Sequence, residues 1–218
     1  MARQTGAWLP AAQRRSARQW PRGLADRLTA PLPGIRDVAR LVRESWGMWR
    51  WRAEADRIPV FRRSSLPRAQ AGQAVVTWVG HASWVIQIGG LIVLTDPVWS
   101  RRIPGAPARV SPVGVDWSAL PPIDAVLISH DHYDHLDAPT ISRLPRNTPV
   151  LVPANLGCWF RRRRFTSVVE LDWWQSRRIG EVTFDFVPAH HWSRRALTDT
   201  CRSLWGGWVL TAGEYRVY

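Results

Sequence analysis

The residues best suited to chemistry lie in one run of six, directly after a strongly apolar segment. The run reads His130, Asp131, His132, Tyr133, Asp134 and His135. The preceding residues 125–128 are Ala-Val-Leu-Ile, which is typical of a buried strand. Imidazole nitrogens and carboxylate oxygens are ligands that zinc takes in proteins. The run therefore predicts a metal site at the end of a strand.

The spacing within this run allows two ions. His130 and His132 stand at positions i and i+2, so they point the same way along extended backbone and can share one ion. A turn would bring Asp134 and His135 to a second ion beside it. Two such ions, roughly 3.5–4 Å apart, can clamp an oxygen of a phosphoryl or acyl group and lower the pKa of bound water toward about 7. This chemistry is metal-assisted hydrolysis.

Composition excludes several other classes of protein. The 218 residues are 45% apolar and 22% charged, which suits a globular core. Every basic residue is Arg, so Schiff-base chemistry on Lys is excluded. Cys158 and Cys201 are too few for a disulfide framework and lack CxxC spacing. No apolar run approaches the roughly 18 residues of a membrane span, and no signal-peptide pattern begins the sequence. We expect a cytoplasmic protein.

Most of the net charge of +13 lies near the N-terminus, where residues 1–70 hold 15 Arg and five acidic residues. Residues 34–55 have apolar side chains near helical spacing with Arg between them, which predicts an amphipathic helix. Such a helix suits peripheral contact with an anionic membrane surface. Two alternatives remain: a helix packed on the body with its Arg in solvent, and a nucleic-acid contact. No recognised module supports specific nucleic-acid binding.

The remaining pattern predicts a mixed α/β fold. Strands come first as a meander, with a turn at Gly89-Gly90, and then alternate with short helices. A long loop is expected over residues 97–122. The predicted strands are 74–79, 84–88, 91–95, 124–128, 149–152, 167–171, 182–187, 204–211 and 215–218. The predicted short helices are 139–144 and 155–164.

An H-x-H-x-D-H run after an apolar strand is the signature of metallo-β-lactamase-fold hydrolases. From about residue 58 to 218 the chain resembles the family of N-acyl-phosphatidylethanolamine-hydrolysing phospholipase D. The resemblance is carried by Trp78-Val-Gly-His-Ala-Ser83, Leu94-Thr-Asp-Pro97, Leu120 to Asp137, Glu170-Leu-Asp-Trp-Trp174, His191-Trp192 and Leu204-Trp-Gly-Gly-Trp208. It implies zinc-dependent cleavage of the phosphodiester of an N-acyl-phosphatidylethanolamine-like lipid.

The resemblance also assigns residues outside the run. It implies that His191 completes the ligands of the first ion; His190 is the competitor, and neighbouring residues at a strand end point to opposite sides. It implies that Asp96 holds a ligand histidine by its second ring nitrogen; the alternative is a turn Asp before Pro97. His81 either approaches the site or is a structural histidine.

Two further aspartates near the run receive non-ligand roles. We expect Asp131 at the edge of the pocket. We expect Asp137 to be the N-cap of the following helix, because Pro139 suits the first helical turn.

The sequence departs from the family in lacking the Asp that bridges both ions and a further late His. We therefore expect residues 58–218 to form the N-terminal half of a two-half αββα sandwich, preceded by a basic extension over residues 1–57. We expect one zinc ion here, where the complete family member has two, and little phosphodiesterase activity from these 218 residues. The alternatives are a hydrolase of a soluble ester, lactone or phosphate, and an inactive chain that binds zinc or lipid.

Overall fold

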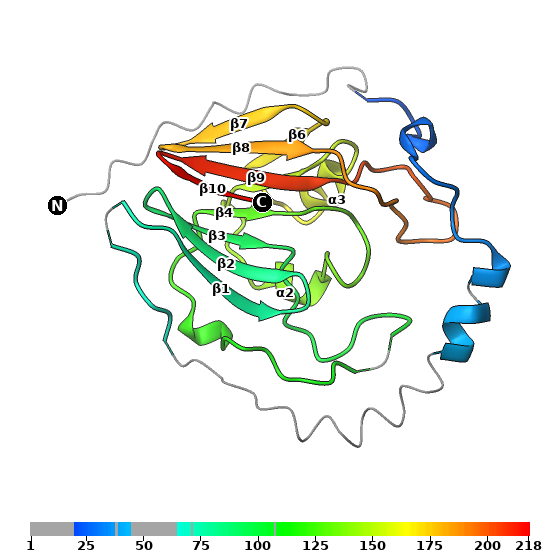
Figure 1. Ribbon diagram of the computed structural model, residues 1–218, viewed down its shortest axis with the longest axis horizontal. Helices are drawn as coiled ribbons and strands as arrows, with labels where there is room; N and C mark the ends of the chain where they lie inside the picture. Colours follow the sequence, from blue (N-terminus) through cyan, green and yellow to red (C-terminus); the bar gives the residue numbers. More distant parts are fainter. Residues whose placement is uncertain (1–19, 38, 45–64, 71, 107) are drawn as a thin grey trace.

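The computed structural model describes residues 20–37, 39–44, 65–70, 72–106 and 108–218 (Figure 1). These residues form two β-sheets. The first sheet has the order β1-β2-β3-β4-β5-β6, and the second has the order β10-β9-β8-β7. The mixed α/β fold expected from the sequence is thus present.

The first sheet is antiparallel at one side and parallel at the other. Its strands are β1 Val75–Gly80, β2 Ser83–Ile88, β3 Leu91–Thr95, β4 Ala125–Leu127, β5 Val150–Pro153 and β6 Val168–Leu171. Strands β1 to β3 form the antiparallel meander, and β3 to β6 pair in parallel. Because parallel strands share one carboxyl edge, the residues that follow β3 and β4 meet there.

The second sheet is fully antiparallel. Its strands are β7 Ser176–Ile179, β8 Val182–Val187, β9 Gly207–Ala212 and β10 Tyr215–Val217. Strand β8 alternates buried and half-buried residues, as its sequence predicts. The residues between β8 and β9 form the long connection that carries His191.

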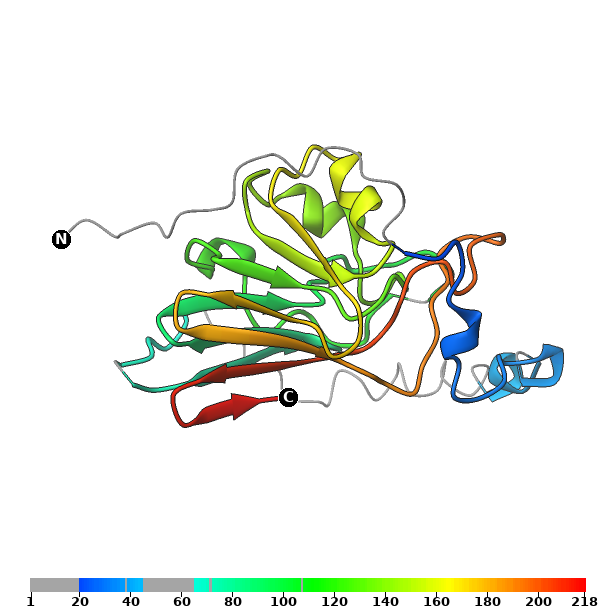
Figure 2. The same ribbon diagram turned by 90° about the horizontal axis from the view of Figure 1, so that it is seen from above.

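The core has two layers. Between the sheets, apolar residues such as Ile86, Leu127 and Phe184 pack together. On the other face of the first sheet, residues such as Val126 pack against the short helices, together with Phe160. Figure 2 shows these helices on the side of the first sheet opposite to the second sheet. Strands β4 and β5 are buried on both faces, which explains their continuous apolar sequences.

The helices in this layer are short. They are α2 Ala138–Ser142 and α3 Gly157–Arg161, with the 3-10 turn η2 Trp117–Ala119. The other 3-10 turn, η1 Ala25–Arg27, follows Leu24, which packs in the core between the sheets. The predicted helix 155–164 is too long at both ends because Asn155 and Arg164 have φ of 69° and 67°, outside the right-handed helical region. No helix among the described residues is long and apolar enough to cross a bilayer.

Two strand predictions also need correction. Strand β7 was missed because its sequence Ser-Arg-Arg-Ile has no apolar alternation; it is a charged edge strand. Strand β9 begins at Gly207, not at Leu204. The reason is that the Leu204 N–H donates to Ala154 O and the Gly206 N–H to Ser129 O, so both bond to loops of the first sheet.

The predicted basic helix 34–55 is described only in part. Residues 35–37 and 39–44 are helical, and residues 45–55 lie outside the described part of the chain. Within the described part, Ile35, Leu41 and Val42 are exposed. The predicted domain boundary at residues 57 and 58 also lies outside the described residues and stays a prediction.

Candidate metal centre

The histidine run begins at the buried end of β4. Ile128 is fully buried, and its carbonyl accepts a hydrogen bond from Trp208 Nε1 in the second sheet. The His132 carbonyl accepts the N–H groups of His135 and Leu136 at 3.1 and 2.8 Å, which closes a tight turn. The strand end and this turn fix where the side chains of the run lie.

Three histidines from two distant segments converge beyond this strand end. His191 Nε2 lies 3.0 Å from His130 Nε2 and 3.2 Å from His132 Nδ1. The three ligand-type nitrogens all lie within 4.8 Å of one another. His190, the competitor for the third position, is exposed and belongs to neither histidine group of the site. The structure thus brings together the three residues predicted for the first ion.

Burial keeps these rings neutral. It lowers the pKa of His132 to about 4, with the neighbouring His191 as the next cause. Burial likewise lowers the pKa of His130, which also feels the nearby His135, and of His191. Neutral imidazoles offer lone pairs, and three lone pairs directed at one point are poorly satisfied without a cation. Three His nitrogens with an open fourth position are the donor set of a catalytic zinc site.

A second group lies beside the first. His81, Asp134 and His135 also have ligand atoms within 4.8 Å of one another. His81 Nε2 lies 3.0 Å from Asp134 Oδ2, and His135 Nε2 lies 3.8 Å from the same oxygen. The His135 ring is 4.0 Å from the His130 ring, centroid to centroid, so the two groups are contiguous.

His81 is the residue of this group that the sequence left undecided. It follows β1 in a turn with φ of 51°, a conformation that costs energy for any residue with a side chain. Its carbonyl accepts a hydrogen bond from Trp78 Nε1 at 2.9 Å, which holds the turn. The sequence signal was Gly80 before His81, because a glycine with φ of 143° lets the chain turn the imidazole toward Asp134.

Asp96 follows β3 at the same sheet edge and contacts the run. Its Oδ2 lies 2.8 Å from His135 Nδ1, and its Oδ1 accepts the Ser129 N–H at 2.7 Å. Burial, the largest single cause, lowers the pKa of His135, but the hydrogen bond and charge of Asp96, together with the charge of Asp134, outweigh burial, so the net pKa is raised. A carboxylate on Nδ1 orients the ring and leaves Nε2 to face the site.

The charge state of Asp134 also follows from its neighbours. Burial, the largest single cause, raises its pKa, but the charge of His135, a backbone hydrogen bond and the charge and hydrogen bond of His81 together outweigh burial, so the net pKa is lowered and the carboxylate stays ionised. An ionised carboxylate beside two imidazoles is a suitable donor set for a divalent cation.

Asp131 is not at the pocket edge, and this prediction was wrong. It is only 5% exposed, its Oδ2 accepts the Ser203 hydroxyl at 2.9 Å, and burial raises its pKa to about 6. Adjacent residues of an extended run point to opposite sides, so Asp131 turns into the protein where its neighbours face the site.

Asp137 does occupy the N-cap position of α2, with Pro139 in the first turn. Its side chain makes no hydrogen bond to a helix N–H. It contacts the Thr140 hydroxyl and accepts the Ser100 N–H at 3.2 Å, which ties the helix to the loop after β3.

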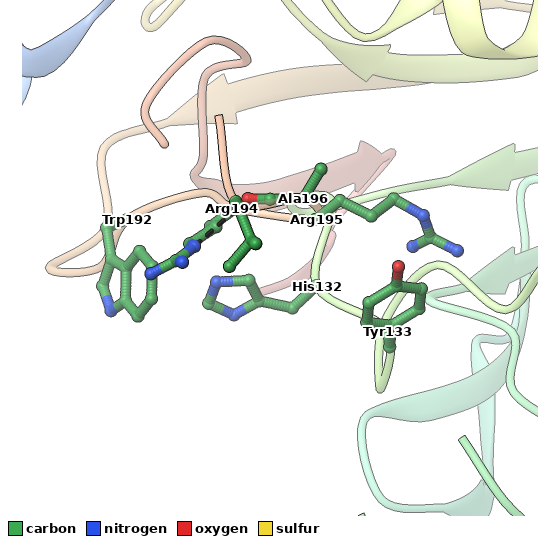
Figure 3. A pocket seen from close by; sticks show the side chains of 7 residues that line it. His132, Tyr133, Trp192, Arg194, Arg195 and Ala196 are labelled. Atoms are coloured by element: carbon green, nitrogen blue, oxygen red, sulfur yellow. Dashed lines mark hydrogen bonds between the residues drawn. The ribbon is translucent and has the colours of Figure 1, made fainter. Parts of the chain in front are cut away.

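A pocket of about 310 Å³ opens beside His132 (Figure 3). Its lining combines cationic and apolar side chains: His132, Tyr133, Trp192, Arg194, Arg195, Ala196 and Leu197. Arg195 is held from both sides, because its Nη1 donates to the Asp131 carbonyl at 2.9 Å and its guanidinium carbon lies 4.2 Å from the centre of the Tyr133 ring. Sequence reasoning did not predict the pocket wall formed by Trp192, Arg194 and Arg195, although the Arg-Arg pair shortly after His191 was a visible signal.

Comparison with known proteins identifies the family. Residues 92–218 match the family described as the Beta-lactamase superfamily domain. The chain belongs to this family. The match contains the histidine run, Asp96 and His191, and it leaves out β1 and β2.

Curated relatives resemble the chain over part of their length. An uncharacterized protein of Mycobacterium tuberculosis is 42% identical over 159 residues, covering 69% of this chain and 42% of that protein. The protein named N-acyl-phosphatidylethanolamine-hydrolyzing phospholipase D 1 of Caenorhabditis elegans is 33% identical over 158 residues, covering 65% of this chain and 44% of that protein. The chain therefore spans less than half the length of these relatives.

Among solved structures, a metallo hydrolase from the archaeon Ignicoccus hospitalis has the same fold. Its TM-score is 0.50 at 18% identity, over 66% of this chain and 58% of that chain. At this identity the similarity concerns the fold alone.

Proposed function

We propose that the chain carries the first metal site of a metal-dependent hydrolase of the phospholipase D type. Its substrate would be the phosphodiester of an N-acyl-phosphatidylethanolamine-like lipid. The observation that carries the proposal is the pocket beside His132, in which Arg194 and Trp192 lie next to the converging histidines. The names of the relatives from Caenorhabditis elegans and Saccharomyces cerevisiae, at 33% and 31% identity, point to the same substrate.

The residues divide the work by position. His130, His132 and His191 would hold the zinc ion expected here, while Asp134 and His135 would form a weaker second site, with Asp96 keeping the proton on His135 Nδ1. A divalent cation held there would supply polarisation of a phosphoryl oxygen and a lowered pKa for water.

The pocket wall would position the substrate. Arg194 offers a guanidinium for a phosphate oxygen, and its planar donors suit that geometry. Trp192 and Leu197 offer apolar surface beside it, and Leu197 is 86% exposed at the rim. A phosphate ester carrying a long apolar chain fits this combination better than a small soluble ester does.

The exposed helix at residues 35–37 and 39–44 supports a lipid interface. Arg36, Arg40 and Arg43 share it with the exposed apolar residues Ile35 and Leu41. A helix with both features is suited to peripheral contact with anionic phospholipid.

The test measures hydrolysis of an N-acyl-phosphatidylethanolamine in mixed micelles with zinc, with and without a chelator. The relative from Caenorhabditis elegans serves as the positive control. We expect only slow release of phosphatidic acid, well below that of this relative, which the chelator abolishes, and a raised KM for Arg194→Ala. Arg178→Ala changes an exposed residue of β7 away from the pocket, and this variant should have the same rate and KM as the unmodified chain.

The outcomes separate the alternatives. Turnover of a soluble ester, lactone or phosphate but not of the lipid would overturn the substrate assignment and keep the hydrolase. Zinc or vesicle binding with no turnover of any of these would favour an inactive binding chain.

A further inference from the structure

A short N-terminal segment lies against the loop that carries the third histidine. This segment, residues 20–28, includes η1 and lies beside the connection between β8 and β9 in both views (Figures 1 and 2). It lies outside residues 92–218, which match the superfamily domain. We call it the strap.

The strap is anchored in the core between the sheets. The Leu24 side chain is 1% exposed and packs in the same cluster as Phe186 and Leu204. Trp20 is partly buried against the same cluster. A leucine at this depth is integrated into the fold and does not belong to a loosely attached tail.

Two polar contacts fix the strap at either side of Leu24. Asn155 Nδ2 donates to the Pro21 carbonyl at 2.7 Å. Arg27 makes a bidentate pair with Asp172, at 3.0 and 3.2 Å, and its guanidinium carbon lies 5.4 Å from the centre of the Trp173 ring. Bidentate Arg–carboxylate pairs fix orientation as well as distance.

From the strap, hydrogen bonds lead to the residues next to His191. The Leu24 N–H donates to the Cys201 carbonyl at 2.7 Å, and the Cys201 N–H donates to the Ser193 carbonyl at 2.8 Å. Ser193 is fully buried, and its hydroxyl donates to the Ser203 carbonyl at 2.5 Å. Ser193 stands two residues after His191. The strap therefore holds this loop directly at Cys201 and, through Cys201, at Ser193.

The same loop supplies the pocket wall. Residues 188–206 connect β8 to β9 with no regular strand or helix, and they carry His191, Trp192 and Arg194. A connection of this length depends on contacts with the rest of the protein to hold one conformation. The strap, with the Ser193–Cys201 pairing, supplies such contacts at its base.

We propose that the strap is a positioning element for the metal centre. By fixing Cys201 and Ser193 it holds His191 at the point where His130 and His132 converge. The proposal rests on the three histidines binding a cation, and it does not depend on the substrate. The group formed by Asp134, His135 and His81 lies on other loops, so it should be affected much less.

The test is a titration of the full chain with Co²⁺. The visible absorption of the bound Co²⁺ is the readout, because it reports the geometry of the histidine-bound ion. Arg27→Ala and Leu24→Ala should weaken binding at the three-histidine site about 10–100-fold, the range for partners that orient ligands. Leu24→Met, which conserves volume, should restore affinity. Arg22→Ala, an exposed change in the same segment, is the matched control and should bind as the unmodified chain does.

Hydrogen exchange gives an independent reading. We expect faster exchange of the Cys201 amide in Arg27→Ala, with the amides of β4 unchanged. If Leu24→Ala does not fold, Arg27→Ala decides alone. Unchanged Co²⁺ affinity and unchanged Cys201 exchange in a folded Arg27→Ala chain would overturn the strap proposal. If the unmodified chain does not bind Co²⁺ at all, that result would instead contradict the metal site itself.

Discussion

His191 Nε2 lies 3.0 Å from His130 Nε2, although the two residues are 61 positions apart in the sequence. His130 lies in the segment that follows the buried strand β4 of the first sheet, and His191 lies in the connection after β8 of the second. The two sheets therefore have to pack in one fixed relative position for His130 and His191 to meet at the candidate metal centre. The site depends on the inter-sheet core as much as on its own residues.

The contact between Asp96 and His135 should control the second ion. In Asp96→Asn the Oδ1 atom must stay an oxygen to accept the Ser129 N–H, so the amide nitrogen would face His135 Nδ1. Two donors would then meet, and the ring would lose its orientation. We expect affinity at the second site to fall about 10–100-fold.

Isothermal titration with zinc measures this effect. Glu214→Gln, an exposed change in the turn between β9 and β10, is the control. Equal second-site affinity in Asp96→Asn and the unmodified chain would show that Asp96 does not orient a ligand.

His81 should contribute to that same second site. Its Nε2 lies 3.0 Å from Asp134 Oδ2, and its turn is held in a costly conformation. We predict that His81→Ala removes the zinc that the weaker second site takes up at excess zinc and leaves the single ion of the three-histidine site, as measured by elemental analysis after dialysis against excess zinc. His190→Ala, which removes an exposed histidine outside both groups, should leave the metal content unchanged. The same metal content in both variants would assign His81 a structural role.

Stability of the metal-free chain should depend on pH through the buried histidines. Their folded pKa values lie below the ordinary 6.5, and that of His132 is about 4. Between these values the unfolded chain binds more protons, so stability falls as pH falls from 7 to 5. Asp131, whose pKa is raised to about 6, opposes this trend, and so does His135, so two groups oppose the three histidines. His135, whose net pKa is raised, loses its contribution to stability only as pH rises through its folded pKa.

Urea unfolding of the metal-free chain at pH 7 and pH 5 tests this trend. We expect a loss on the order of 1–2 kcal/mol at the lower pH. His132→Asn removes one of the titrating groups and should flatten the dependence. A chain that is more stable at pH 5 than at pH 7 would show that these histidines are not held neutral.

The core between the sheets should carry much of the stability. Phe184 in β8 is fully buried there. Phe184→Ala should cost about 3–5 kcal/mol in urea unfolding, because it leaves a cavity between the sheets. Tyr215→Ala, at an exposed aromatic in β10, should change stability by less than about 0.5 kcal/mol. Similar losses in both variants would contradict this view of the core.

The sequence predicted local features well where periodicity and chemistry agree. Alternation along residues 182–187 indicated β8, and the apolar run before Ser129 indicated β4. The histidine run was visible because its residue types are rarely clustered by chance. Each of these signals lies within a few neighbouring positions.

The features that sequence reasoning missed depend on contacts between distant segments. Strand β7 pairs with β8 through its backbone, so its Arg residues gave no signal. Leu24 looked like part of a basic extension, and only the packing of the two sheets creates the site that it fills. Asp131 differs from its neighbours because the hydroxyl of Ser203, 72 positions away, donates a hydrogen bond to its buried carboxylate.

The most direct test of the central claim is cation binding by His191→Ala compared with His190→Ala. The two variants remove neighbouring histidines, of which only His191 lies with His130 and His132. Zinc titration with Co²⁺ spectra should show the high-affinity site lost in His191→Ala and intact in His190→Ala. An intact site in His191→Ala, or its loss in His190→Ala, would contradict the three-histidine centre.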